Sequence, residues 1–85
     1  MSQEFVHRLT ALQEGTYRVH YLGRGYMLTK QTLLDGRLVK IYAYELGGND
    51  VVSGNFYPTI RQGTLKPCEM SERKVIDFIL GCVDD

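Results

Sequence analysis

The sequence predicts an α+β fold in which one helix at each end of the chain packs on the same face of an antiparallel β-meander of four strands, extended by a weaker fifth. Three observations predict it: a short amphipathic pattern near the N-terminus, strand-like segments separated by glycine-containing turns, and a broad apolar helical pattern near the C-terminus. With 85 residues and 44% hydrophobic side chains, we expect one domain over residues 1–85 with a single modest core.

The first helix is predicted by its cap and by the spacing of its apolar residues. Ser2 is a suitable N-cap residue, and Gly15 supplies a C-terminal stop. Between them, large apolar side chains recur at helical spacing at Phe5, Leu9 and Leu12. Glu4 and Arg8 are placed to form an ion pair on the outer side of this helix.

Strand-like segments dominate the middle of the chain, and short turn sequences separate them. The segments are TYRVHYL (16–22), YMLTKQTLL (26–34), RLVKIYAYEL (37–46) and VVSGNFY (51–57), with a weaker candidate in GTLK (63–66). The turns are GRG (23–25), DG (35–36) and GGND (47–50). Strands joined by turns this short pair as antiparallel neighbours, which gives the meander.

The turns also predict which side chains share a face of the sheet. The pairs that follow from a two-residue loop at Asp35-Gly36 are Leu28–Ala43, Lys30–Ile41 and Thr32–Val39. One face then carries an aliphatic core, namely Leu28, Val39, Ile41, Ala43, Val52 and Phe56. The other face carries Met27, Thr29, Lys40, Tyr42, Tyr44, Ser53, Asn55 and Tyr57. We expect both helices to pack on the aliphatic face.

The GRG segment contains two glycines, as phosphate-binding loops do, but its context favours a hairpin turn. A dinucleotide-binding fingerprint needs a third glycine and then a helix, whereas Leu28 stands at that position and a strand follows. With a bulge at Gly25, the side chains that join the core face are Tyr17, Val19 and Tyr21. Without the bulge, those that point at the helices are Arg18, His20 and Leu22. The bulge is favoured because it keeps Arg18 out of the core.

The second helix is predicted over residues 72–83, after an N-cap at Ser71, with Met70 and Val75 placed as a hydrophobic staple. Its apolar side chains cover an arc of about 200° at helical spacing. They are Val75, Ile76, Phe78, Ile79, Leu80, Cys82 and Val83. One sheet contact needs a narrower arc, so we expect the first helix or a second subunit to cover Phe78 or Leu80. A homodimer is therefore one expected partner.

No catalytic constellation is recognisable in the sequence. His20 lies within a strand, Cys68 lies near the start of the second helix, and Cys82 lies on that helix's apolar stripe as a small core residue. The two cysteines and two histidines have no metal-binding spacing. We therefore expect no enzymatic activity and neither a cofactor nor a metal site. A small enzyme that uses His20 or Cys68 is the weakest interpretation.

Charge and hydropathy limit the location and the partners. Ten basic residues balance ten acidic ones, so the bulk charge attracts neither nucleic acid nor anionic lipid, although cations outnumber acids between Tyr17 and Tyr44. No apolar run is long enough to cross a bilayer, and the start, MSQEFVHRL, lacks the apolar segment of a signal peptide. We expect a cytoplasmic protein, away from membranes, with reduced cysteines.

The tyrosine-rich face is the strongest functional signal. Tyrosine combines apolar bulk with a polar hydroxyl and loses little conformational entropy on binding, which suits contact surfaces. The face predicts a small non-enzymatic protein-interaction module (an adaptor, inhibitor or regulatory subunit) that binds a protein partner through this face or an edge strand. The predicted contact residues are Tyr42, Tyr44, Tyr57, Met27 and Lys40. The alternative is that these tyrosines reflect strand propensity alone.

A nucleic-acid-binding domain is the alternative function. The element order resembles that of the double-stranded-RNA-binding family, in which a helix, three strands and a helix follow one another; this resemblance covers architecture only and implies RNA binding. That family has a lysine-rich start to its last helix, where this chain has SERKVID (71–77), with two cations beside two acids. A single-stranded mode would instead stack bases on the tyrosines. The cations available to it are Lys40, Arg18 and Arg24.

Overall fold

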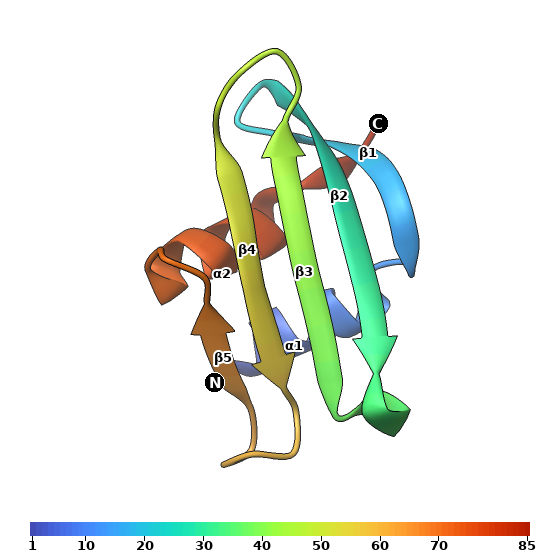
Figure 1. Cartoon of the computed structure of the whole chain (residues 1–85), viewed down its shortest axis with the longest axis vertical. Coiled ribbons are helices and arrows are strands. Elements are labelled where there is room, and N and C mark those ends of the chain that lie inside the picture. Colours follow the sequence, from blue (N-terminus) through green and yellow to red (C-terminus); the bar gives the residue numbers. More distant parts are fainter.

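Two helices cover one face of a six-stranded antiparallel sheet and leave the other face bare (Figure 1). The computed structural model describes residues 1–85. The elements are α1 (Gln3–Ala11), β1 (Gly15–Tyr21), β2 (Arg24–Leu33), a 3-10 turn η1 (Leu34–Gly36), β3 (Leu38–Glu45), β4 (Val51–Tyr57), β5 (Thr64–Pro67), α2 (Glu72–Gly81) and β6 (Val83–Asp84). The α+β class and the placement of both helices are confirmed. The predicted number of four or five strands is wrong: the weaker candidate GTLK does form strand β5, but β6 follows α2 as a sixth strand.

Strands β1 to β5 form the predicted meander, and β6 adds to the outer edge of β1, in the order β5-β4-β3-β2-β1-β6. Strands β2 and β3 pair in the predicted register, with Lys30 opposite Ile41. The loop between them spans residues 34–37 rather than two residues, because Leu33 and Leu38 form the last pair. Register, not loop length, decides which side chains share a face, so the predicted faces are retained.

The first hairpin turns one residue earlier than predicted and has no bulge. Tyr21 pairs with Arg24, and the two residues between them, Leu22 and Gly23, have φ angles of 51° and 77°. These left-handed values are those of a tight two-residue hairpin turn, and glycine adopts them without strain. Moving the turn by one residue places the same side chains of β1 on the core face as a bulge at Gly25 would have done. Val19 is therefore buried, as predicted.

The core lies between the sheet and the helices. Every predicted member of the aliphatic face is buried, namely Leu28, Val39, Ile41, Ala43, Val52 and Phe56. The helices and their C-caps add Phe5, Leu9, Leu12, Val75, Phe78, Ile79 and Cys82. The parity of the central strands is therefore confirmed: aliphatic side chains face the helices, and the tyrosines of β3 face away.

Both helices begin where predicted. The side-chain oxygen of Ser2 accepts a hydrogen bond from the backbone N–H of Phe5 at 3.3 Å, and that of Ser71 accepts one from the backbone N–H of Lys74 at 3.2 Å. Each bond satisfies one of the backbone donors that a helix start leaves without a partner. Neither helix has the length and apolar character that crossing a membrane requires.

Helix α1 ends at Ala11, before the predicted stop at Gly15, and its end is held by a buried lysine. Lys30 reaches from the sheet, is 6% exposed, and donates hydrogen bonds to the carbonyls of Leu9 and Leu12 at 2.7 and 2.8 Å. An ammonium group is favourable here because the last carbonyls of a helix carry partial negative charge. Lys30 therefore joins helix and sheet at one point of the core.

Helix α2 ends at Gly81, two residues earlier than predicted, and an arginine holds its end. Arg8 donates from α1 to the carbonyl of Ile79 at 3.2 Å and also to the carbonyl of Cys82. The predicted outer ion pair between Arg8 and Glu4 is therefore wrong, because the guanidinium group turns toward α2. Each helix thus has a cation at its C-terminal end, supplied by another element.

Phe78 is fully buried within the chain, so the prediction that it contacts a partner is wrong. Its ring lies against those of Tyr21 and Tyr26, with centroids 5.0 Å away in both cases and edge-to-face geometry. The cover therefore comes from rings of β1 and β2, not from a second subunit. Leu80, two residues further along α2, remains half-buried.

Tyr26 links this aromatic cluster to a polar contact at the β3–β4 loop. Its hydroxyl donates to the Asp50 carboxylate at 2.7 Å, and the Lys74 ammonium donates to the other oxygen at 2.6 Å. Both bonds lower the pKa of Asp50, and the bond from Lys74 has the larger effect. Burial, reinforced by the bond to Asp50, raises the pKa of Tyr26 to about 12. The contact ties strand β2, the loop and α2 together.

We expect the stability of the protein to fall as the pH rises from about 10 to about 12, and replacement of Tyr26 by phenylalanine to remove much of that loss. The phenol binds its proton more tightly in the folded chain than at its ordinary pKa of 10.0, so alkaline ionisation favours unfolding. The difference corresponds to about 2–3 kcal/mol. Urea denaturation across this pH range measures it. Tyr42→Phe, which removes an exposed hydroxyl, should keep the wild-type dependence; equal slopes for both variants would contradict the assignment.

Candidate interaction surface on the open face of the sheet

The face of the sheet opposite the helices has no covering element (Figure 1). The strand registers give its outward side chains. They are Thr16, Arg18, His20, Met27, Thr29, Gln31, Leu33, Leu38, Lys40, Tyr42, Tyr44, Val51, Ser53, Asn55, Tyr57, Thr64 and Lys66. We call this surface the open face. It contains no Asp or Glu.

Two tyrosines stand side by side on strand β3. Tyr42 and Tyr44 are 47% and 45% exposed, and their ring centroids are 6.1 Å apart with the planes tilted by 47°. Met27 lies directly opposite Tyr44 in the ladder with β2. Strand β3 is paired on both sides, so the rings project from a rigid element. The fold leaves both rings half-uncovered in a fixed arrangement.

Lys40 continues this surface along β3, and Tyr57 of β4 lies at its far end. Lys40 is exposed and follows Tyr42 on the same face of β3, two residues away. Tyr57 follows Asn55, the partner of Lys40, by two residues on the same face of β4, so it lies diagonally next to Lys40 and about 20 Å along the sheet from Tyr44. The structure thus places all five predicted contact residues on the open face, and four of them lie on the adjacent strands β2 and β3. We call these four the tyrosine patch: Met27, Lys40, Tyr42 and Tyr44.

A hollow of about 400 Å³ lies beside the tyrosine patch on the open face. It forms where the short side chain of Ser53 stands opposite Tyr42 in the ladder. Its lining residues are Thr29, Gln31, Lys40, Ile41, Tyr42, Ser53, Asn55 and Cys68. The hydroxyl of Thr29 is bonded to that of Thr16 at 2.8 Å, whereas the other hydroxyl, amide and ammonium groups of the lining have no hydrogen-bond partner in the chain. They are free to bind a ligand.

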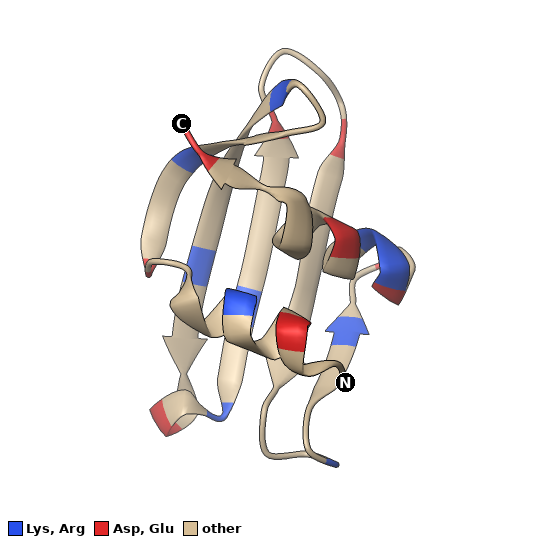
Figure 2. Ribbon diagram, turned by 180° about the vertical axis from the view of Figure 1, so that it is seen from behind, with Lys and Arg blue, Asp and Glu red and all other residues tan.

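Charge on the open face has one sign. Lys40 and Lys66 make no ion pair, and Arg18 and His20 share the carboxylate of Asp85 at the β1 edge, at 2.9 and 2.8 Å. The opposite side of the molecule differs, because both helices carry acidic and basic segments there (Figure 2). The centre of the open face therefore offers positive charge without a competing carboxylate.

Sequence reasoning missed three residues that lie in or beside the hollow: Gln31, Lys66 and Cys68. Gln31 lies two residues beyond Thr29 on β2, so the predicted register already placed it on this face. Lys66 needed strand β5, which had only a weak signal, and it pairs with Asn55. Cys68 was considered only for its place before α2, yet its backbone N–H donates to the carbonyl of Ser53 at 3.0 Å, beside the hollow.

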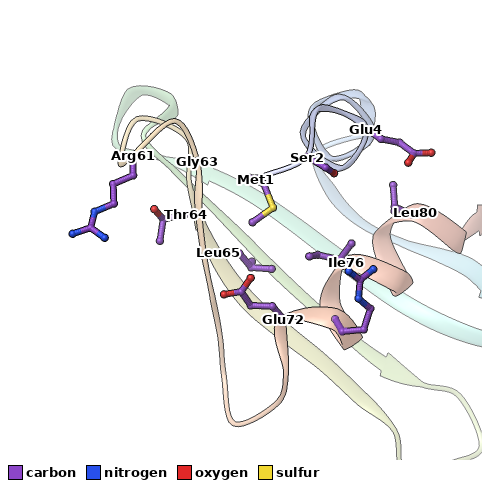
Figure 3. Close-up of a pocket in the computed structure, with 11 residues that line it drawn as sticks. Met1, Ser2, Glu4, Arg61, Gly63, Thr64, Leu65, Glu72, Ile76 and Leu80 are labelled. Carbon is purple, nitrogen blue, oxygen red and sulfur yellow. The ribbon is translucent and has the colours of Figure 1, made fainter.

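A larger hollow, of about 620 Å³, lies on the helix side between the starts of α1 and α2 and the β4–β5 turn (Figure 3). Leu80, the other predicted partner contact, lines it. The remaining lining residues are Met1, Ser2, Glu4, Arg61, Gly63, Thr64, Leu65, Glu72, Arg73 and Ile76. Apolar side chains and charges of both signs are mixed in this lining, so it favours no single ligand chemistry.

The groups considered for catalysis or metal binding are not brought together. His20 is bound to Asp85, and Cys68 is exposed with no side-chain hydrogen bond. No three His, Cys, Asp or Glu side chains converge as a metal site would need. A scan against protein-family models and searches of characterised proteins and of solved structures found no match to the chain.

Proposed function

We propose that this chain is a small protein-interaction module that binds a partner protein through the open face, at the tyrosine patch. The observation that carries the proposal is the pair of half-exposed rings, Tyr42 and Tyr44, on a sheet face that no other element covers. Neither ring contributes to the core, so strand propensity is the one structural reason for two large side chains there.

The chemistry of the tyrosine patch suits protein contact. Tyrosine and methionine are enriched at the centre of protein interfaces, where apolar area is buried and a hydroxyl can still find a partner. The rings rest on a strand paired on both sides, so little conformational freedom is lost when a partner binds. These two features together make the rings suitable energetic centres of an interface.

The open face supports this role better than the sheet edges do. Strand β5 is four residues long and ends in Pro67, which cannot donate a ladder hydrogen bond. At the opposite edge, β6 pairs with Val19 and His20 of β1, which leaves only a short free stretch, residues 15–18, before them. Short or covered edges of this kind limit the addition of a partner strand.

Binding of single-stranded nucleic acid is the second candidate, and the acid-free charge of the open face favours it. Bases would stack on the rings while Lys40 and Lys66 contact phosphates. A double-stranded-RNA mode has less support, because the cations at the start of α2 are engaged. Arg73 pairs with Asp77 at 3.2 Å, and Lys74 pairs with Asp50 at 2.6 Å.

The double replacement Tyr42→Ala/Tyr44→Ala should abolish partner recovery while leaving the chain folded. Loss of interface-centre residues costs about 2 kcal/mol or more each, which is about thirtyfold in affinity. Affinity purification from an extract of the source cells, with quantitative mass spectrometry, measures the recovery. Ile60→Ala is a matched control, because Ile60 is 46% exposed and Tyr42 is 47% exposed.

The outcomes separate the candidates. Equal recovery by the double variant and the wild type would contradict the proposal. Binding of a single-stranded oligonucleotide at low salt, lost in the double variant without any protein partner, would favour the second candidate. Sedimentation velocity on the wild-type chain shows in addition whether a second copy occupies the face, and circular dichroism verifies that each variant is folded.

A further inference from the structure

The distribution of charge on the open face indicates what kind of partner it accepts. The chain has equal numbers of acidic and basic residues, yet no carboxylate points outward from strands β1 to β5. Glu45, the acidic residue of β3, pairs with Tyr26 and therefore lies on the side of the sheet that faces the helices. The carboxylate of Asp85, which follows β6, is bound by Arg18 and His20 at the edge of this face. The unpaired cations of the face are then Lys40, on the inner strand β3, and Lys66, on the other edge strand, β5.

Lys40 is the one charged residue that lines the hollow. Lys40 lines it together with hydroxyl and amide groups of Tyr42, Ser53, Asn55 and Gln31, and no acidic residue is among its lining. Lys66 lies next to Asn55 in the ladder, on the far side from Lys40. The two lysines are therefore about 10 Å apart across three strands. A single anionic group above the hollow can receive charge-assisted hydrogen bonds from Lys40 and neutral ones from its neighbours.

We propose that the hollow receives the carboxylate of an Asp or Glu in an extended acidic segment of a partner protein. This inference rests on the proposed function and names the chemistry of the partner. Charge complementarity selects an acidic segment, because a cation would meet no carboxylate in the hollow and would lie beside Lys40.

A short acidic peptide fits this surface better than a nucleic-acid strand does. Two unpaired lysines neutralise few phosphates, whereas nucleic-acid binding gains its affinity from many such contacts. The zero net charge of the chain also removes the long-range attraction that steers polyanions to basic proteins. Binding of one carboxylate beside an apolar contact requires neither many phosphate contacts nor long-range attraction.

The geometry of β3 predicts the spacing in the partner. Tyr44, Tyr42 and Lys40 follow one another at every second residue, so their side chains are spaced by about 7 Å along the strand. An extended segment lying parallel or antiparallel to β3 presents its own side chains at the same period. An acidic residue over Lys40 is then two to four positions from a large apolar residue over the rings.

Selection of peptides from a random dodecapeptide library displayed on phage tests this inference, with the whole chain immobilised. We expect peptides enriched on the wild type to carry Asp or Glu two to four positions from a large apolar residue. The variant Lys40→Glu should reverse the preference and enrich Lys or Arg at that position. Arg73→Glu makes the same charge change at an exposed residue on α2 and should select the same peptides as the wild type.

A synthetic peptide from the wild-type selection then gives the affinities. Its dissociation constant should rise about tenfold or more with Lys40→Gln, as expected for loss of a charge-assisted hydrogen bond, and should be unchanged with Arg73→Glu. The binding should also weaken when the acidic residue of the peptide is replaced by its amide. Equal affinity for wild type and Lys40→Gln would overturn the inference.

The remaining outcomes distinguish this inference from the proposed function. Peptides without an acidic preference that still lose binding in Tyr42→Ala/Tyr44→Ala would overturn the acidic-segment inference and keep the interaction surface. Failure to enrich any peptide would also overturn the inference, while affinity purification judges the proposed function separately. Binding of an oligo-dT strand that is lost in Lys40→Glu, with no enriched peptide, would assign the face to nucleic acid instead.

Discussion

Replacement of Lys30 by methionine is expected to lower the free energy of unfolding by about 2–4 kcal/mol, although the two side chains are similar in length. Lys30 is 6% exposed, and its ammonium donates to the carbonyls of Leu9, Thr10 and Leu12. Burial lowers the pKa of Lys30, and the Glu14 carboxylate, 3.9 Å away, opposes this effect. Methionine fills the space but leaves the helix-end carbonyls without a donor, and leaving a buried acceptor unpaired costs more than a typical hydrogen bond contributes.

Lys40→Met is the matched control for this prediction. Lys40 lies on the neighbouring strand, opposite Gln31, so it projects from the other face of the sheet and is exposed. Its replacement should change stability by less than about 0.5 kcal/mol. Urea denaturation monitored by circular dichroism measures both variants. Similar midpoints for Lys30→Met and Lys40→Met would show that the ammonium of Lys30 does not hold the end of α1.

The contrast between these two lysines shows what the sequence could predict. The register of β2 and β3 followed from turn chemistry, and it already placed Lys30 opposite Ile41, on the core side. What that register could not supply was the reason for a cation there. The partner groups belong to the end of α1, about 20 residues earlier in the chain, and no local pattern shows that this end lies above β2.

Local signals also account for what was predicted correctly and what was not. Serine N-caps and apolar periodicity predicted both helix starts, because a cap involves residues three apart. Strand β6 has two residues and depends on pairing with Val19 and His20, so no strand pattern could reveal it. The turn at Leu22 and Gly23 was missed because leucine rarely adopts a positive φ, and the neighbouring GRG is the stronger turn signal.

The same distinction applies to the candidate site. Alternation along β3 predicted that Tyr42 and Tyr44 share a face with Lys40, and the structure places them together. Tyr57 shares this face next to Lys40 but lies about 20 Å along the sheet from Tyr44, a distance that alternation alone does not show. The acid-free character of the open face depends on all five strands at once, including the weakly predicted β5, so it became visible only when the whole sheet was assembled.

Phe78→Ala is expected to lower the free energy of unfolding by about 3–5 kcal/mol, a large part of the stability of a domain this size. The ring of Phe78 is fully buried and lies against the rings of Tyr21 and Tyr26. Its removal therefore creates a cavity and eliminates two edge-to-face contacts. Leu80→Ala, at a half-buried position of the same helix, should cost about 1 kcal/mol. Urea denaturation measures the two variants against the wild type.

The dependence of the unfolding midpoint on protein concentration decides what covers Phe78. If rings of the same chain cover it, the wild-type midpoint does not change with concentration, because folding is then unimolecular. A subunit seated on α2 would make the midpoint rise with concentration, since association stabilises only the folded chain. A concentration-dependent midpoint that Phe78→Ala abolishes, or equal costs for Phe78→Ala and Leu80→Ala, would contradict the intramolecular packing. A constant midpoint with unequal costs assigns the broad apolar arc of α2 to this chain's own sheet, and leaves the open face as the surface for a partner.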